Sequence, residues 1–371
     1  MSVRQAATVI AAALVMAAPG VAAAVLPAAS TAPRTTATAA ATAAIASTVP
    51  AAPAVGAARS RVVVRYVRDG WPNPLPAYGP DLVAHDPSMV QGADSRWYVF
   101  STHDGVQVRV SGDRQHWTRL GAAFPHGVAL AKQYNGNPME IWAPDVSRHH
   151  GTYFMYYAVS SFGSNNSAIG LATSATAAPG SWTDQGLVFA TKTGDTINAI
   201  DPNLAVDSAG RWWLTFGSFW SGIAQVRLDP ATGHRLAGDT AAPKLLASRP
   251  DLPSHAVEAP FLVQQGRWYY LFMSFDLCCQ GEASSYREMV GRSLSPRGPF
   301  YDATGRALLD GGGTQIVGTH DTYIGTGGGS VVRDRHGYEL VYHYYDGLAA
   351  GLPHLALNRL EFDNDGWPHL S

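Results

Sequence analysis

Residues 201–216 read DPNLAVDSAGRWWLTF, an Asp-Pro pair followed by a run of aromatic and aliphatic residues. Four related stretches lie elsewhere in the chain. The five aromatic runs begin at Trp97, Tyr153, Trp212, Trp268 and Tyr338, which gives spacings of 56, 59, 56 and 70 residues. A sustained period of this length in strand-like sequence is typical of a β-propeller or another repeat array.

Each copy divides into four strand-like segments. Apolar residues follow the proline, and a turn separates them from the aromatic run. An alternating segment such as 106–110 comes next, and then a short segment with an aromatic residue, as at Trp117, Trp182 and Phe300. Five copies of four antiparallel strands predict an all-β fold, a five-bladed β-propeller. A β-sandwich is the alternative, but sandwiches do not repeat at a fixed period. We expect no amphipathic helix after residue 60.

The N-terminal sequence has a different character from the repeats. Arg4 precedes an apolar stretch at 6–18 and small residues at 21–24, which predicts a secretory signal peptide over residues 1–24. An uncleaved anchor is the alternative, although a membrane span needs roughly 20 apolar residues. The Ala-, Thr- and Pro-rich segment 25–60 predicts a disordered linker. Residues 61–371 then form the propeller domain of a secreted, extracellular protein.

The chain has 26 basic and 28 acidic residues without basic runs, which argues against nucleic acid as a partner. We expect a neutral ligand, no membrane association after signal cleavage, no organic cofactor and a monomer. The only cysteines are the neighbours Cys278 and Cys279. Because adjacent residues are difficult to bridge, two buried thiols in a loop are favoured over a strained disulfide.

The start of each repeat carries the candidate site. In a propeller the first strand of each blade lies nearest the axis, so residues at its start share one funnel. Aligning the repeats places Asp86, Ala143, Asp201, Ala259 and Gly327 at one position, with Glu258 one residue earlier than Ala259. A following proline favours extended backbone, which predicts that these residues begin a strand.

Three carboxylates, those of Asp86, Asp201 and Glu258, are thus expected at one rim, with Asp145 farther along a fourth strand. A charge at such a place is costly unless it is paired or used. Clustered carboxylates shift one another's pKa, so that one acid can be neutral while another is ionised. Hydrolysis of a glycosidic bond uses such a pair. The alternatives are structural caps at the blade entrances, or a metal ion held by the three carboxylates.

These residues lie in motifs that resemble glycoside hydrolase family 43 and, within it, the endo-acting α-1,5-L-arabinanases. The motifs are HDPS at 85–88, IWAPDV at 141–146, NAIDPN at 198–203, GSFWSG at 217–222 and VEAPF at 257–261. The resemblance spans roughly residues 75 to 368. It implies a five-bladed propeller and a single-displacement inverting mechanism, with Asp86 as general base, Glu258 as general acid and Asp201 as the carboxylate that tunes and orients Glu258. An inverting pair is expected to lie roughly 6.5–9.5 Å apart.

The resemblance and the chemistry of the side chains also suggest ligands for a sugar. The candidates are His85, Trp142, Asp145, Gly163, Asn198, Ser218, Phe219, Trp220 and Arg292. Rings suit stacking on sugar faces, and hydroxyls and amides can bind sugar hydroxyl groups. The family implies a hydrated Ca²⁺ in the central channel near a histidine, for which His320 is the candidate. The chain differs from many relatives in having GTGG at 325–328 where they have Gly-Pro-Gly-His.

The expected function is therefore hydrolysis of internal α-1,5 bonds in arabinan or arabino-oligosaccharides. Two alternatives remain open. One is an exo-acting arabinofuranosidase or xylosidase of the same fold, because loop shape decides between a groove and a pocket. The other is a non-catalytic sugar-binding propeller, which would not need all three acids.

Overall fold

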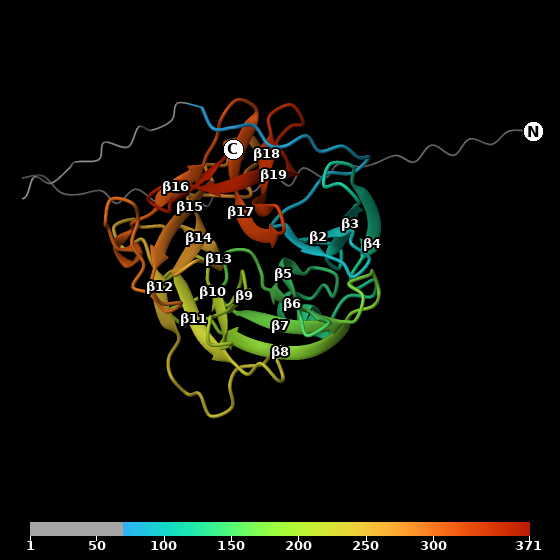
Figure 1. Ribbon diagram of the computed structural model, residues 1–371. Helices are drawn as coiled ribbons and strands as arrows, with labels where there is room; N and C mark the ends of the chain where they lie inside the picture. The colour runs from blue at the N-terminus through green and yellow to red at the C-terminus, as the bar shows by residue number, and fades with distance from the viewer. Residues whose placement is uncertain (1–69) are drawn as a thin grey trace, which may run out of the picture. The chain divides into compact units, whose positions relative to one another are not determined.

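The computed structural model describes residues 70–371, so the predicted signal peptide (1–24), the whole predicted linker (25–60) and residues 61–69 lie outside the described residues. The described chain forms five four-stranded sheets, each antiparallel and in chain order, around a central axis (Figure 1). The predicted five-bladed β-propeller is therefore confirmed. Within the described residues, no helix has the length and apolar character that a membrane crossing needs.

The blades follow one another along the chain. Blade 1 contains β1 (Ser88–Gln91), β2 (Trp97–Ser101), β3 (Gln107–Ser111) and β4 (Thr118–Ala122). Blade 2 contains β5 (Trp142–His149), β6 (Thr152–Val159), β7 (Ser167–Ser174) and β8 (Thr183–Thr191). Blade 3 contains β9 (Asn203–Val206), β10 (Trp212–Phe216), β11 (Ile223–Leu228) and β12 (Lys244–Ala247). Blade 4 contains β13 (Val257–Gln265), β14 (Trp268–Phe275), β15 (Arg287–Ser293) and β16 (Thr314–Val317). Blade 5 contains β17 (Tyr323–Asp334), β18 (Gly337–Asp346), β19 (Leu352–Phe362) and β20 (Pro368–Leu370).

The aromatic runs form the second strand of each blade because these strands are buried on both faces. In β2, Tyr98 and Phe100 belong to an apolar cluster shared with blade 2, whereas Trp97 and Val99 belong to a cluster shared with blade 5. Successive residues of a strand point to opposite faces, so one strand serves both neighbours. Similar clusters join the other adjacent blades, and together the five interfaces close the ring.

The segment that precedes blade 1 strengthens the closure between the first and last blades. Leu75 N–H donates to the Leu357 carbonyl at 2.7 Å, and Ala84 N–H donates to the Pro353 carbonyl at 2.9 Å, both on β19. The same segment pairs with blade 1 near β4, where Trp117 N–H donates to the Tyr78 carbonyl at 2.8 Å. Residues 75–84 therefore bridge blade 5 and blade 1.

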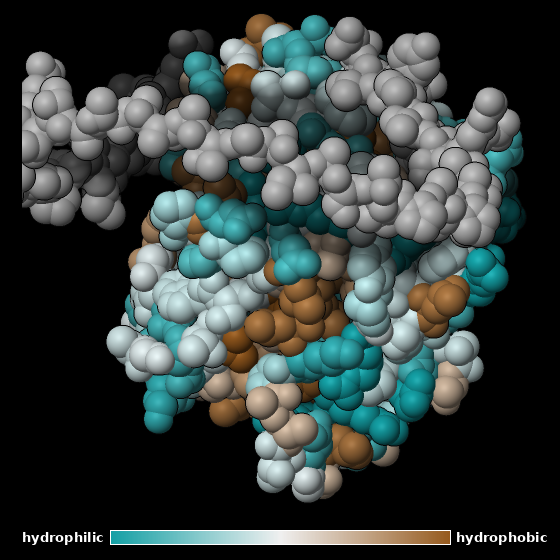
Figure 2. All heavy atoms as spheres, turned by 90° about the vertical axis from the view of Figure 1, so that its left-hand side faces the viewer, coloured by the Kyte–Doolittle hydropathy of each residue, from teal (hydrophilic) through white to brown (hydrophobic). Residues whose placement is uncertain are grey.

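Two local expectations differ from the structure. A short helix, α1 (Ala129–Asn135), follows blade 1 and buries Leu130 and Ala131 against blade 2. Its seven residues are too few to show a clear helical period in the sequence. The fourth strand of blade 4 lies at 314–317 and not around Phe300, because an insertion with the 3₁₀-helix η2 (Leu308–Asp310) precedes it. The outer side that carries β12 and β16 mixes hydrophilic residues with a hydrophobic strip (Figure 2).

Polar side chains near the axis connect each blade to the next. Ser88 Oγ accepts the N–H of Val146 at 2.9 Å, and Asp145 Oδ2 accepts the N–H of Leu204 at 2.7 Å. Asn203 continues the pattern by accepting the N–H of Leu262 from blade 4. Because Ser88, Asp145 and Asn203 occupy equivalent positions, these bonds form a partial ring of hydrogen bonds between the blades. Asp145, predicted as a sugar ligand, therefore has a structural role in the fold.

Asp145 generates a prediction about stability and pH. Burial raises its pKa to about 6 despite its bonds to Leu204 and Asn203. Since the folded state then binds this proton more tightly than the unfolded chain, ionisation of Asp145 lowers stability as the pH rises from about 4 to about 6. Asp145→Asn keeps an acceptor for Leu204 and cannot ionise. We expect the variant to gain stability relative to the wild type between about pH 4 and pH 7, measured by denaturant unfolding.

Asp145→Ala is the matched control, because it leaves the Leu204 N–H without an acceptor. We expect it to lower the free energy of unfolding by about 1–3 kcal/mol. A stability difference between Asp145→Asn and the wild type that stays constant across this pH range would contradict the assignment.

Candidate active site

The inner strand of every blade is entered through a residue with left-handed backbone. The φ angles are 47° at Asp86, 41° at Ala143, 56° at Asp201, 51° at Ala259 and 62° at Gly328. The predicted extended backbone is therefore wrong, and the fifth equivalent residue is Gly328, not Gly327. Strand pairing shifts register around this position in β5, β13 and β17, so the chain bends there before it continues as a regular strand.

Left-handed backbone costs a non-glycine residue about 1–2 kcal/mol, so it persists only where the surroundings hold it. Four of the five entrance N–H groups donate to a side chain of the preceding blade around the ring. The acceptors are His343 Nδ1 for Asp86 at 3.1 Å, Thr102 Oγ1 for Ala143 at 2.8 Å, Asp201 Oδ2 for Ala259 at 3.0 Å and Ser274 Oγ for Gly328 at 2.9 Å. These bonds fix the entrance residues relative to one another.

Asp86 is surrounded by donors on one side of its carboxylate. Its Oδ2 accepts hydrogen bonds from His85 Nδ1 and Thr102 Oγ1, both at 2.8 Å. Its Oδ1 lies 3.8 Å from His343 Nδ1 and accepts no hydrogen bond within residues 70–371. Burial alone would raise the pKa of Asp86, but the charge and hydrogen bond of His85, with help from His343 and Thr102, hold the pKa well below its usual range. Asp86 is therefore ionised, with one free oxygen.

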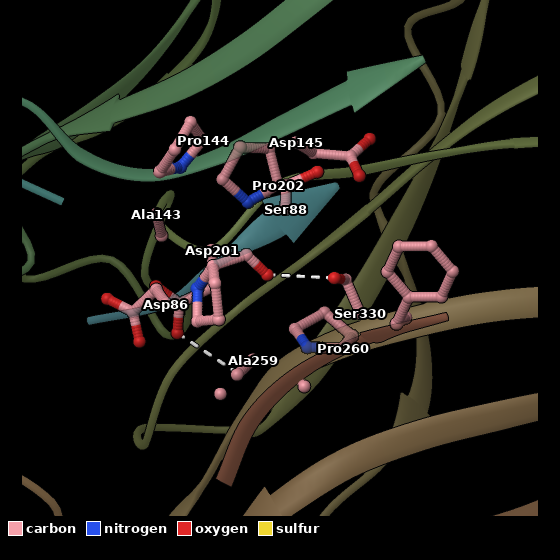
Figure 3. Close-up of a pocket in the computed structure, with 14 residues that line it drawn as sticks. Asp86, Ser88, Ala143, Pro144, Asp145, Asp201, Pro202, Ala259, Pro260 and Ser330 are labelled. Carbon is pink, nitrogen blue, oxygen red and sulfur yellow. Dashed lines mark hydrogen bonds between the residues drawn. The ribbon is translucent and has the colours of Figure 1, made fainter. Parts of the chain in front are cut away.

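Glu258 and Asp201 show the opposite behaviour. Glu258 is 7% exposed, and its Oε2 accepts a hydrogen bond from Ser218 Oγ at 2.6 Å. Burial raises the pKa of Glu258, and the negative charge of Asp86 raises it further. Burial followed by the charges of Glu258 and Asp86 raises the pKa of Asp201 well above its usual value. Such mutual effects require the three carboxylates to be close neighbours, as predicted. Asp86 and Asp201 also line one axial cavity (Figure 3).

Two stacked histidines support Asp86. The rings of His85 and His343 have centroids 3.9 Å apart, and His343 is fully buried. Burial lowers the pKa of His343, and the charge of His85 lowers it further. A neutral imidazole accepts through one nitrogen, and Nδ1 of His343 has this role because it faces the Asp86 N–H. His85 Nε2 lies 2.8 Å from the hydroxyl of Tyr345.

Several predicted sugar ligands lie beside this cluster. Phe219 N–H donates to the carbonyl of Val257, which attaches the loop containing Ser218, Phe219 and Trp220 to the strand that carries Glu258. Phe219 and Trp220 are half-buried, so part of each ring remains accessible.

The other predicted sugar ligands, Trp142, Asn198 and Gly163, differ in burial and in hydrogen bonding. Trp142 donates through Nε1 to Glu140 Oε1 at 2.6 Å, and His103 Nδ1 bonds the same oxygen at 2.7 Å. Asn198 is buried and accepts a hydrogen bond from Ser167. Gly163 lies in the exposed loop between β6 and β7.

Arg292 is not brought to the rim. Its guanidinium lies over the rings of Trp268 and Trp367, 4.4 and 4.2 Å from their centroids, and donates to the Asp365 carbonyl. The side chain therefore contributes to packing between blades 4 and 5, which corrects its prediction as a sugar ligand.

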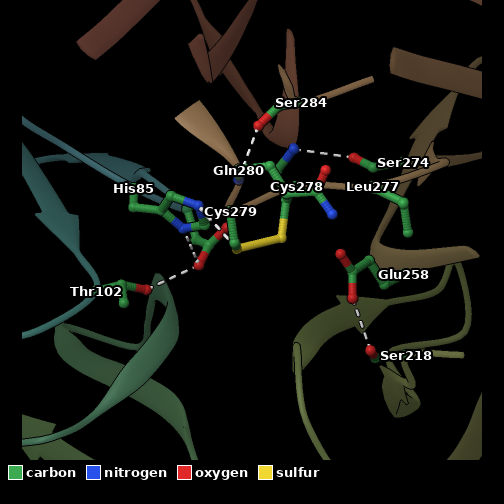
Figure 4. The surroundings of a disulfide bond; sticks show 12 residues. His85, Thr102, Ser218, Glu258, Ser274, Leu277, Cys278, Cys279, Gln280 and Ser284 are labelled. Carbon is green, nitrogen blue, oxygen red and sulfur yellow. Dashed lines mark hydrogen bonds and ion pairs between the residues drawn. A yellow bond between two sulfur atoms is a disulfide. The ribbon is translucent and has the colours of Figure 1, made fainter. Parts of the chain in front are cut away.

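Cys278 and Cys279 form a disulfide, which corrects the expectation of two buried thiols. Cys279 is exposed, and its Sγ lies 3.7 Å from His85 Nε2. In Figure 4 the disulfide lies between His85 and Glu258, so this bridge belongs to the wall of the site.

The described residues do not form an oxygen-rich metal cage. Groups of three or more potential ligands within residues 70–371 are His85 with the two cysteines, and His85 with Asp86 and His343. Calcium prefers six to eight oxygen ligands, and neither group supplies them. His320 is in neither group, and its Nδ1 bonds the Gly318 carbonyl at 2.8 Å. The described residues therefore form no oxygen cage for calcium, whereas the buried Nε2 of His320 has no hydrogen-bond partner within residues 70–371. No catalytic step is routed through a calcium ion.

Sequence reasoning missed Tyr286, His343 and Tyr345 as parts of the site. Tyr286 is buried and hydrogen-bonds Glu258. His343 and Tyr345 lie in the aromatic run of blade 5, where they read as core residues. A histidine within an otherwise apolar run was the one signal that could have identified them. With them the site combines an ionised carboxylate and a buried acid of raised pKa. These are the two groups that general acid–base catalysis uses.

Comparison with known proteins agrees with this chemistry. The family model described as Glycosyl hydrolases family 43 matches residues 81–368. The chain is 41% identical to extracellular endo-α-(1→5)-L-arabinanase 1 of Bacillus subtilis, over 76% of this chain and 86% of the relative. It is 36% identical to the extracellular exo-α-(1→5)-L-arabinofuranosidase of Cellvibrio japonicus, over 77% and 86%. The solved endo-arabinanase of Bacillus licheniformis superposes with a TM-score of 0.74 at 41% identity, covering 81% of this chain and all of that one.

The pKa of Glu258 offers a test of the cluster. Because the negative charge of Asp86 raises the pKa of Glu258, we expect Asp86→Asn to lower the pKa of Glu258. Ser218→Ala removes a hydrogen bond that lowers this pKa, so we expect that variant to raise it. Titration of the Glu258 carboxyl by ¹³C NMR measures both shifts. Equal or same-sign shifts in the two variants would contradict the geometry.

Proposed function

The chain belongs to glycosyl hydrolases family 43, and from this premise we propose that it hydrolyses the α-1,5-L-arabinofuranosidic bonds of arabinan. The observation that carries the proposal is the contrast between Asp86, whose pKa is lowered, and Glu258, whose pKa is raised, at the entrances of blades 1 and 4. Relatives named for action on this bond, at about 40% identity, support the choice of substrate.

Asp86 is proposed as the general base. Its Oδ2 is occupied by His85 and Thr102, which leaves Oδ1 to accept a proton from water. Glu258 is proposed as the general acid, because burial keeps its proton available for the leaving oxygen. Asp201 shares the electrostatic environment of Glu258 and is proposed to tune its proton affinity.

We propose a single displacement with inversion. In that mechanism water attacks from the face opposite the leaving group, so the two carboxyl groups stand apart with the sugar between them. The position of Asp86 and Glu258 on blades 1 and 4, at different points around the axis, supports this arrangement. The hydrated calcium implied by the family stays a prediction.

Endo action is proposed, with exo action as the second candidate because one relative is named as an exo-acting arabinofuranosidase. We also propose export, supported by the signal-like residues 1–24 and by relatives named as extracellular. Product length tests the mode of attack. We expect linear arabinan to yield a range of oligosaccharides early in the reaction, resolved by anion-exchange chromatography. A single product length from the first time point would favour exo action, and binding without product would favour a sugar-binding propeller.

The two catalytic roles predict different substrate dependence. Glu258→Gln cannot protonate a poor leaving group, so we expect its rate on arabinan to fall about 10²–10⁴-fold, with a smaller loss on an aryl arabinofuranoside whose phenolate leaves readily. Asp86→Asn lacks the base and is expected to lose activity on both substrates. Parallel kinetics of the two variants, with folding checked by circular dichroism, measure this difference. Equal losses of the Glu258 variant on both substrates would contradict its role as acid.

A further inference from the structure

A chain of hydrogen bonds leads from the Cys278–Cys279 disulfide to the carboxylate of Asp86. Cys279 N–H donates to the hydroxyl oxygen of Tyr345 at 2.6 Å, and this hydroxyl lies 2.8 Å from His85 Nε2. His85 Nδ1 then bonds Asp86 Oδ2 at 2.8 Å. An ionised carboxylate only accepts hydrogen bonds, so Nδ1 of His85 carries the proton. The orientation of the His85 ring is thus determined from both ends.

Tyr345 is the central member of this chain. It is 2% exposed, and burial raises its pKa, so the hydroxyl keeps its proton. The ring of His343 packs edge-on against it, with centroids 5.3 Å apart, and this fixes the position of the hydroxyl. The Tyr345 hydroxyl therefore faces Nε2 of His85, on the side of the ring opposite Nδ1 and Asp86.

The sulfur of Cys279 is the second neighbour of His85 Nε2, at 3.7 Å. In a disulfide this sulfur has no proton to donate and accepts hydrogen bonds weakly. As a free thiol it could donate a proton to Nε2, and as a thiolate it could accept one, because thiols beside histidines ionise readily. Opening the bridge would therefore give Nε2 a partner that competes with Tyr345.

We propose that Tyr345 and the closed Cys278–Cys279 disulfide are positioning elements that keep His85 oriented against Asp86, and that a free Cys279 thiol draws His85 away from it. The catalytic consequence rests on the proposed function, in which Asp86 activates water. These residues do not touch the reacting atoms in this role. They act through His85.

The bridge can be opened by a small dithiol. The S–S bond breaks, each sulfur gains one electron and one proton, and the dithiol is oxidised to its own disulfide. Cys279 is exposed, so the reagent can reach it. The chain has only these two cysteines, so an effect of a dithiol that is absent when both are replaced passes through this pair.

Two single variants separate the sulfur from the bridge. Cys278→Ala and Cys279→Ala both lack the disulfide, but only Cys278→Ala leaves a thiol beside His85. We expect kcat on arabinan to fall roughly tenfold in Cys278→Ala and in dithiothreitol-reduced wild type, with a smaller change in KM. We expect a clearly smaller fall in kcat in Cys279→Ala. Tyr345→Phe should lower kcat as well. Reduction of the Tyr345→Phe variant should lower kcat by a smaller factor than reduction of the wild type, because both changes act on the ring of His85.

A spectroscopic readout makes the test independent of hydrolysis. In protein labelled with ¹⁵N-histidine, the Nε2 resonance of His85 is assigned by its absence in His85→Gln. We expect it to move on reduction of the wild type and to stay unchanged when dithiothreitol is added to the Cys278→Ala/Cys279→Ala double variant. Thiol titration establishes that reduction is complete.

The outcomes decide between the ideas. An unmoved His85 resonance and unchanged kcat in fully reduced wild type would overturn the proposal, and so would equal losses in the two single variants. If the wild type released no sugar from arabinan while the His85 resonance moved on reduction, the proposed function would fail and the positioning role would stand.

Discussion

The site depends on hydrogen bonds that hold left-handed backbone at the entrances of four of the five inner strands. Asp86, Ala143 and Ala259 adopt a conformation that L-residues avoid, and a side chain of the neighbouring blade accepts the N–H of each. The bend points the residues at and just before the entrance into a common space. Chain segments far apart in sequence thereby present Asp86, Asp201 and Glu258 to one another.

The carboxylates of the site differ in protonation because they have different hydrogen-bond partners. All are removed from bulk water to a large degree, which by itself raises the pKa of an acid. Asp86 has His85 and Thr102 as donors and becomes the ionised member of the set. Glu258 has only neutral donors, Ser218 and Tyr286, so burial decides its protonation. One cluster therefore contains both a base and an acid.

The sequence allowed the ring of blades and the three acids to be predicted because both follow from a repeated pattern. Strands buried on both faces produce aromatic runs, and the Asp-Pro and Glu-Ala-Pro motifs mark the entrances. The register of blade 5 could not be predicted in the same way, because Gly328-Gly329 replaces the residue and proline that align the other repeats. The left-handed backbone was missed because the rule for residues before proline describes an isolated chain, whereas here contacts between blades decide the conformation. Arg292 was misjudged because Trp367, on which its guanidinium lies, comes from another blade. The cysteines were misjudged because the general difficulty of bridging adjacent residues did not prevent a disulfide here.

The most direct measurement of the central claim is neutron diffraction from deuterium-exchanged crystals at neutral pH. It locates deuterium on individual carboxyl oxygens, which kinetics and ordinary diffraction do not. The account predicts deuterium on the carboxyl group of Glu258, none on Asp86, and a deuteron between His85 Nδ1 and Asp86 Oδ2. Deuterium on Asp86 with a bare Glu258 would contradict the assignment of base and acid.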